Sequence, residues 1–252
     1  MSRILAIVNQ KGGVGKTTTA INLGAALGAL EHRVLLVDCD PQGNATRGLG
    51  QAAQPPHLYH ALIEECSPQE AIRPSGFPHL DLLPSDRNLV GVEVEFVGQD
   101  GWERRLRRLL KSVAADYDSV LLDCPPSLGH LTVNALAAAD EVLVPLQCEY
   151  FALEGISELM ATVQRVQGGI NPELGINGIL LTMYDDRTNL SKDVAEEIRS
   201  HFTDKVYRTV VPRNVRLAEA PSHGLPIFQY DIRCRGARAY LDLAQEFIHR
   251  AA

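Results

Sequence analysis

The segment Asn9–Thr18, with the sequence NQKGGVGKTT, constrains the fold of this 252-residue chain more than any other stretch. A short apolar run, RILAIV, precedes it and indicates a buried strand, and apolar residues at helical spacing follow it. A strand, a glycine-rich turn and a helix in this order are the context of a phosphate-binding loop. Glycines let backbone N–H groups surround phosphate oxygens, and the helix N-terminus adds further donors. The alternative is a tight glycine turn that binds nothing.

The loop has a conventional half and an unusual half. Lys16 can reach the β- and γ-phosphates of a nucleotide, and the Thr17 hydroxyl suits a direct ligand of Mg²⁺. The usual pattern, G-x-x-x-x-G-K-[ST], places glycine where this chain has Gln10, and Lys11 adds a second lysine. The predicted nucleotide contacts in the loop are Lys11, Gly12, Gly13, Val14, Gly15, Lys16, Thr17 and Thr18.

Strand-like apolar runs alternate with helix-like segments along the whole chain. This pattern predicts an α/β fold with a mostly parallel, twisted sheet that carries helices on both faces. We find no internal repeat and no long linker, so we expect one domain over residues 1–252. Predicted strands after RILAIV are 33–38, 80–85, 119–127, 142–147, 178–185 and 206–213, and predicted helices are 17–30, 57–65, 103–113, 155–166, 191–202 and 237–251.

Two acidic segments follow predicted strands, where ligands of open α/β sheets bind. VDCDPQGN contains Asp38 and Asp40, which share one face if the chain is extended there. LLDCPPS ends an apolar strand with Asp123, the usual arrangement of a Walker B carboxylate. Such carboxylates can orient a water molecule or hold the hydration shell of Mg²⁺. Acidic caps of strands and turns are the alternative.

The early lysine, both acidic segments and VVPRNVRLAEAPSHGLP, in this order, resemble the deviant P-loop ATPases of the ParA/Soj type. The resemblance implies ATP and Mg²⁺ as cofactors, with Lys11, Lys16 and Asp40 as catalytic residues. Lys11 is then expected to cross a dimer interface to the partner's nucleotide, and Asp40 to position the attacking water. Two further sets are implied: Thr17 as a direct Mg²⁺ ligand with Asp38, Asp40 and Asp123 acting through water, and Pro212 and Asn214 around adenine.

The same resemblance implies nonspecific binding of double-stranded DNA by the ATP-bound homodimer, through Arg187, Arg213 and Arg216. Charge is uneven, because residues 1–186 hold 13 Lys and Arg against 23 Asp and Glu, whereas residues 187–252 hold 11 against 8. An anionic partner is therefore expected at the C-terminal quarter. Solvated surface arginines are the alternative, as they are for the basic run Arg104–Lys111.

The expected activity is a slow hydrolysis of ATP to ADP and phosphate, stimulated by a ParB-type centromere-binding protein, in the cytoplasm at the nucleoid. The cargo stays open between a chromosome, a plasmid and another body. No segment precedes the first strand, so no N-terminal helix-turn-helix module is expected. No membrane partner is expected either, because the last helix carries Asp242 and Glu246 and little basic character.

Other activities on this fold stay as alternatives. A MinD-like membrane-cycling ATPase needs a basic amphipathic C-terminal helix, and an ATP-dependent ligase or amidase needs a substrate pocket. An iron–sulfur reductase needs cysteines placed to hold a cluster, whereas the five cysteines here form no C-x-x-C pair. A tyrosine kinase of this group would have a tail rich in tyrosine, and only Tyr240 lies near the C-terminus.

Overall fold

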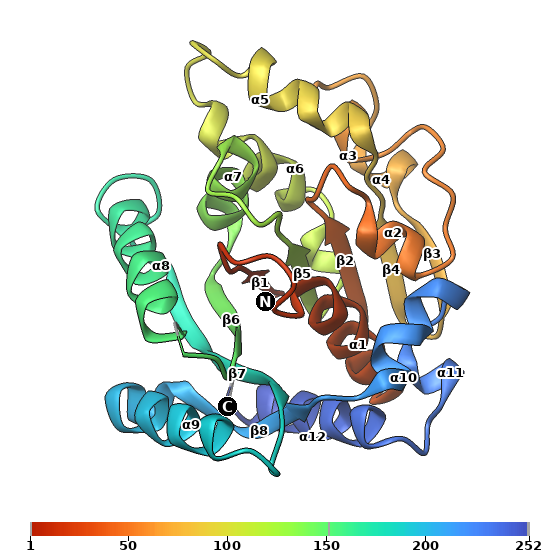
Figure 1. The fold of residues 1–252 in the computed structure, drawn as a ribbon. Helices are drawn as coiled ribbons and strands as arrows, with labels where there is room; N and C mark the ends of the chain where they lie inside the picture. The colour runs from red at the N-terminus through yellow and green to blue at the C-terminus, as the bar shows by residue number, and fades with distance from the viewer. Residues whose placement is uncertain (1, 151, 251–252) are drawn as a thin grey trace.

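The computed structural model describes residues 2–150 and 152–250, and its centre is one eight-stranded sheet (Figure 1). The strand order is β3-β4-β2-β5-β1-β6-β7-β8, and every neighbouring pair is parallel except β3 with β4. The predicted fold class is thereby confirmed. The strands are β1 (Arg3–Ile7), β2 (Val34–Asp38), β3 (Arg73–Phe77), β4 (Leu80–Leu83), β5 (Ser119–Asp123), β6 (Glu141–Gln147), β7 (Gly175–Tyr184) and β8 (Val206–Pro212).

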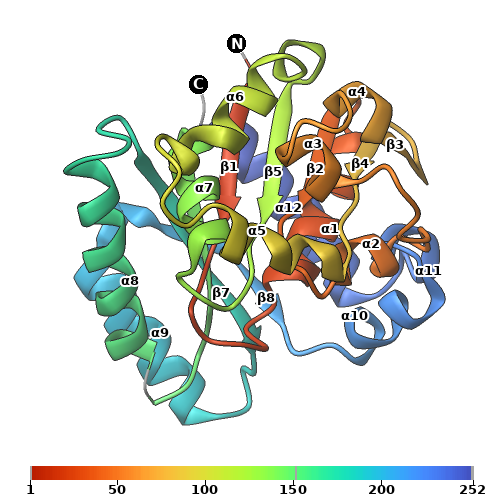
Figure 2. The same ribbon diagram turned by 90° about the horizontal axis from the view of Figure 1, so that it is seen from above.

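Helices cover both faces of the sheet (Figures 1 and 2). Successive residues of a strand point to opposite faces, so Leu5 and Ile7 of β1 join one buried cluster while Ala6 joins the other. The first face packs against α1 (Lys16–Ala29), α2 (Asn44–Gly48), α10 (Val215–Glu219), α11 (Ile227–Tyr230) and α12 (Arg235–His249). The second packs against α3 (Leu58–Leu62), α4 (Pro68–Ala71), α5 (Gly91–Glu95), α6 (Arg105–Lys111), α7 (His130–Ala138), α8 (Ala152–Gln167) and α9 (Asn189–Phe202).

Several elements are absent from the predicted set: strand β3 and the short helices α2, α4, α5, α7, α10 and α11. Strand β3 was missing from it, because Pro74 and Gly76 interrupt the apolar alternation that marks a strand. It lies at the edge of the sheet, where a proline costs no ladder hydrogen bond. Helix α7 was also missing, because it is short and buried on most sides, so its apolar residues do not form one helical stripe.

The last helix packs into the protein. Tyr240, Leu243, Ala244 and Phe247 of α12 are buried against the face of the sheet that also carries α1. Within the described chain, no helix combines the length and the apolar character needed to cross a membrane.

The topology brings three loops to one end of the sheet. Strand β1 leads into the glycine-rich segment, and β2 and β5 lie next to each other with Asp38 and Asp123 in register. Because these strands are parallel, their carboxyl ends point the same way, and the residues that follow them form one edge.

Candidate nucleotide and magnesium site

The glycine-rich segment is a left-handed turn that starts a helix. Gly13 and Gly15 have φ angles of 75° and 92°, values that glycine adopts without strain. Gly15 is the N-cap of α1, so the helix begins at Lys16 and its first N–H groups open onto the turn. The Thr182 hydroxyl on β7 donates to the Val14 carbonyl over 2.8 Å and fixes the turn to the sheet.

Lys16 lies folded over the loop. Its side chain is largely buried, with the residue 7% exposed, and its Nζ donates to the Lys11 carbonyl oxygen over 3.0 Å. Burial lowers the pKa of Lys16, while the nearby carboxylates of Asp123 and Asp40 act in the opposite direction. A buried ammonium beside free N–H groups is a strong point charge for the terminal phosphates of a nucleotide.

Asp123 is the most deeply placed acid of the site. Both carboxylate oxygens are fully buried, and neither accepts a hydrogen bond of ordinary geometry from the described residues. Burial raises the pKa of Asp123 well above its usual value, the charge of Asp38 adds to this, and the Thr17 hydroxyl and Lys16 favour the ionised form. An unsatisfied buried carboxylate is costly unless a cation or its water molecules complete it.

Asp38 and Asp40 have different surroundings. Asp38 is fully buried, and its oxygens accept from the Thr46 amide over 2.8 Å, the Thr46 hydroxyl over 2.7 Å and the Asp40 amide over 3.2 Å. Burial raises the pKa of Asp38 to about 6 against the effect of these donors. Asp40 accepts from the Gln42 amide over 2.9 Å and faces a cavity. Asp38 thus orders the loop that presents Asp40.

Two adjoining cavities lie at this edge of the sheet. The larger, of about 500 Å³, contains the loop and Asp40, and the smaller, of about 300 Å³, lies between the ends of β7 and β8 and helix α12. They share Gly15, Thr18 and Met183, so one ligand can extend from the first into the second. The smaller is mainly apolar and includes Pro212 and Asn214, as expected for a base pocket.

Asn214 also has a structural role. Its side-chain oxygen accepts from the Leu217 amide over 3.3 Å and caps α10, which leaves its amide NH₂ group for the cavity.

The residues fit a hydrated Mg²⁺ better than a site built of protein ligands alone. Among the described residues, no three His, Cys, Asp or Glu side chains converge closely enough to hold a metal. The oxygens available are the Thr17 hydroxyl, the unsatisfied Asp123 carboxylate and Asp40. Mg²⁺ commonly keeps several waters and takes few protein oxygens beside phosphate, which matches this donor set.

Lys11 projects from the loop and is held by its own chain. Its Nζ forms an ion pair with Glu149, which follows β6. The two side chains are 53% and 41% exposed, so the pair lies at the surface. A Cβ atom built on the adjacent Gly12 would meet nothing within 4 Å, so the chain itself leaves this face of the loop open.

The three predicted DNA-contacting arginines lie near the carboxyl ends of β7 and β8 and differ in their partners. Arg187 donates to both oxygens of Asp185, over 2.9 and 2.8 Å. Arg216 donates to Glu219 over 2.9 Å and lies 3.5 Å from Asp231. The guanidinium of Arg213 has no hydrogen-bond or ion-pair partner in the part of the chain that is described, and it borders the smaller cavity.

Several residues of the site are absent from the predicted set. Asn44, Arg47 and Ser222 line the larger cavity, and Met183 lines both. Met183 has a φ angle of 49°, an uncommon conformation for a side chain other than glycine and one that recurs at functional sites. Asn44 and Arg47 follow Asp40 closely in the sequence, so their position near the site could have been predicted from it. The positions of Met183 and Ser222 depend on the three-dimensional fold.

Comparison with known proteins places this geometry in a family. Residues 2–176 match the family described as AAA domain. The chain is 54% identical over 248 residues to the sporulation initiation inhibitor protein Soj of Bacillus subtilis, which covers 98% of each chain. It is 54% identical over 252 residues to the chromosome partitioning protein ParA of Caulobacter vibrioides, covering 98% of this chain and 94% of the relative.

Solved structures share the fold over the whole described length. Cobyrinic acid a,c-diamide synthase from Mycobacterium smegmatis, with bound ADP and magnesium, has a TM-score of 0.88 and 38% identity, covering 100% of this chain and 96% of that one. The cell division ATPase MinD of Pyrococcus furiosus has a TM-score of 0.82 and 29% identity, with both chains covered fully. The loop, the paired carboxylates and the near-complete match to Soj and ParA agree, and the chain belongs to the ParA/Soj family of chromosome-partitioning P-loop ATPases.

Proposed function

We propose that this protein is a DNA-partitioning ATPase, one domain over residues 1–252, that dimerises around ATP and Mg²⁺. In this proposal the dimer binds double-stranded DNA without sequence preference and releases it after hydrolysis. The observation that carries the proposal is the proximity of Lys16 to the carboxylates of Asp40 and Asp123, with Lys16 and Asp40 lining a cavity that continues into an apolar base pocket.

The chemistry follows from where charge develops. Phosphoryl transfer depends mainly on positioning and on electrostatic stabilisation of the terminal phosphate. Lys16 and the first N–H groups of α1 bind that phosphate, and Mg²⁺ held by Thr17 and, through water, by Asp38, Asp40 and Asp123 supplies additional positive charge when bound. Asp40 orients the attacking water, because it is the acid that faces the cavity with one oxygen free of backbone donors. Pro212 and Asn214 hold the adenine.

Dimerisation completes the site. Lys11 lies outside its own chain's phosphate cavity, and its ion pair with Glu149 is exposed and therefore weak, so Lys11 can exchange Glu149 for a nucleotide on a second copy. The open face at Gly12 supports close apposition of two loops. This arrangement makes ATP part of the interface, and it makes hydrolysis the event that loosens the dimer.

Binding of DNA is assigned to Arg187, Arg213 and Arg216. The excess of basic residues after position 186 supports this assignment. To bind phosphates, Arg187 must leave the carboxylate of Asp185 and Arg216 that of Glu219. Arg213 has no carboxylate to leave in the described part of the chain. The family membership supports a ParB-type centromere-binding protein as the stimulating partner, and a cytoplasmic, nucleoid-associated location.

A second candidate comes from the likeness to cobyrinic acid a,c-diamide synthase. In that case a site beside the bound ATP would have to hold an acid to be amidated, and the activity would not involve DNA. The higher identity to Soj and ParA, 54% against 38%, favours partitioning. A MinD-like membrane cycle fits less well, because the apolar face of α12 is already buried.

The test is DNA binding by fluorescence anisotropy with ATP, with ADP and without nucleotide, on duplexes of unrelated sequence. The proposal expects tight binding with ATP alone and equal affinity for all duplexes. If ATP leaves DNA affinity unchanged while ATP is still hydrolysed, the partitioning proposal is wrong and the synthase alternative gains.

A further inference from the structure

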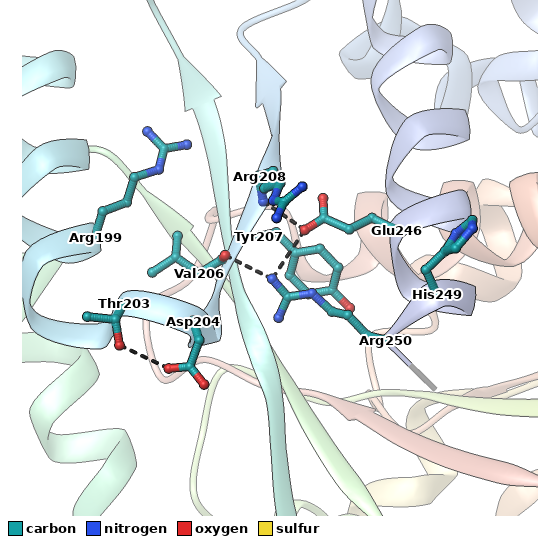
Figure 3. A pocket seen from close by; sticks show the side chains of 9 residues that line it. All are labelled: Arg199, Thr203, Asp204, Val206, Tyr207, Arg208, Glu246, His249 and Arg250. Carbon is teal, nitrogen blue, oxygen red and sulfur yellow. Dashed lines mark hydrogen bonds and ion pairs between the residues drawn. The ribbon is translucent and has the colours of Figure 1, made fainter. Parts of the chain in front are cut away.

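A groove follows the free edge of the sheet, away from the nucleotide cavities. Strand β8 is the last strand, and a hollow of about 640 Å³ lies along its first half between α9 and α12 (Figure 3). A second hollow of about 450 Å³ lies along its second half. The first is lined by Arg199, Thr203, Asp204, Val206, Tyr207, Arg208, Glu246, His249 and Arg250.

Three backbone groups in the first half of this edge are already satisfied by side chains. The pairing of β8 with β7 shifts between Val206 and Val210, and the released amides of Arg208 and Thr209 both donate to Glu246, over 2.8 and 2.9 Å. On the same side, Arg250 donates to the Val206 carbonyl over 2.9 Å. An added peptide strand needs free backbone groups, so the first half of this edge favours contacts through side chains over strand pairing.

Most charges in the groove are paired within the chain. Arg250 contacts Glu246 at 3.2 Å and lies 4.0 Å from the centre of the Tyr207 ring, as Figure 3 shows. In the second hollow, Arg238 lies 3.0 Å from Asp242. Arg235 there lies 3.7 Å from Asp186. In the first, the Asp204 carboxylate accepts from the Thr203 hydroxyl over 2.9 Å.

Two arginines are in surplus. Neither Arg199 on α9 nor Arg208 on β8 has a hydrogen bond or ion pair from its guanidinium among residues 2–150 and 152–250, and both residues are exposed. In Figure 3, Arg199 projects from the α9 side, and Arg208 lies at the strand near Glu246, which accepts from the Arg208 backbone amide over 2.8 Å. Their guanidinium groups differ from those of Arg187 and Arg216, which are engaged with carboxylates.

We propose that this β8 edge groove is a second contact surface for the phosphate backbone of duplex DNA, with Arg199 and Arg208 as its phosphate ligands. The inference rests on the proposed function and extends its DNA surface along β8. The planar guanidinium of arginine suits the oxygens of a phosphate. Arg199 and Arg208 can each bind a phosphate without first breaking an ion pair. Arg208 lies five residues before Arg213, at most about 17 Å along a strand, which matches about five base-pair steps of DNA.

The experiment compares the salt dependence of DNA binding in two proteins that differ only at the groove. Both carry Asp40→Ala, which is expected to hold the ATP-bound dimer, and one also carries Arg199→Ala and Arg208→Ala. Each lost phosphate contact flattens the slope of log K against log[salt] by about 0.9. We expect a flattening of about 1.8 if one protomer's groove contacts the duplex, and about 3.6 if both do. When Arg199→Ala and Arg208→Ala are introduced without Asp40→Ala, the rate of ATP hydrolysis should equal that of the unsubstituted protein.

Two control proteins sharpen the comparison. Arg199→Lys with Arg208→Lys should keep the slope, since the positive charge is retained. Arg104→Ala with Lys111→Ala removes two exposed charges on or beside α6 and should also keep it.

Three results overturn the inference. An unchanged slope in the Arg199→Ala/Arg208→Ala protein, with the parent still binding DNA, removes the groove and leaves the proposed function standing. Absence of any ATP-dependent DNA binding in the parent removes both. If the Arg199→Ala/Arg208→Ala protein binds DNA like its parent but no longer binds poly-glutamate, which the parent binds, the groove is assigned to an acidic protein segment instead.

Discussion

The ion pair between Lys11 and Glu149 should restrain dimerisation, because Lys11 cannot serve its own chain's Glu149 and a partner's nucleotide at once. Glu149→Gln removes the charge of the acid and keeps its size. Both side chains are about half exposed, so the pair is a surface ion pair worth about 0.2–1 kcal/mol. The variant should therefore release Lys11 at little cost to folding.

The expected gain is set by symmetry. Two copies of the pair must open for one dimer, so the variant should favour the dimer by about 0.4–2 kcal/mol, or about 2- to 30-fold in its dissociation constant. We would measure this constant by sedimentation with ATP in the Asp40→Ala protein at 50 mM salt. At 1 M salt the difference between the parent and the Glu149→Gln variant should shrink, because exposed charges are screened.

The control is the same substitution in a Lys11→Ala protein, where no lysine remains to be released and the dissociation constant should not change. A Glu149→Gln dimer that is no tighter than its parent at low salt would refute the reasoning. An equal gain in the Lys11→Ala background would show that Glu149 acts on the interface through something other than Lys11.

Three further outcomes are expected. Asp40→Ala should bind ATP and dimerise but not hydrolyse it; size-exclusion chromatography with ATP checks this, and a monomer with unchanged turnover contradicts it. Gly12→Val should fold and still bind ATP, since a Cβ atom at this position meets nothing in the chain within 4 Å, yet stay monomeric; light scattering that finds a normal ATP dimer would exclude the sandwich. Gly28→Ala places a Cβ atom 2.5 Å from a backbone carbonyl and should cost about 1–3 kcal/mol of unfolding free energy in urea. Gly155→Ala, a helix position with open space, is its control and should not destabilise.

Much of the fold was predictable because periodicity reports burial. Central strands such as β2 and β5 are buried on both faces and therefore appear as unbroken apolar runs. The rule fails at β3, where Pro74 and Gly76 hide an edge strand, and at α7, whose residues are buried on nearly every side. In both, the neighbours in space decide the structure, and a single sequence does not contain them.

From the sequence one could predict which acidic residues of the site lie close together. The hydrogen-bond partners that distinguish these acids could not be predicted. Parallel strands bring Asp38 and Asp123 together, and that follows from their positions at strand ends. The saturation of Asp38 by Thr46, eight residues later, depends on the loop conformation. The contact of Arg216 with Asp231 is likewise a product of the fold.

The exposed cations assigned to binding fall into two groups. Lys11, Arg187 and Arg216 are each held by an acid of their own chain, and exposed pairs of this kind are weak. A paired cation that binds a single phosphate gives up its own carboxylate, so the net gain in binding free energy is small. A ligand that contacts several such cations at once adds these small gains together. Within the described chain, Arg199, Arg208 and Arg213 have no acid to exchange, so they contribute at first contact. DNA and a second nucleotide-bound copy present many charges together, and these are the partners that such a surface favours over isolated anions.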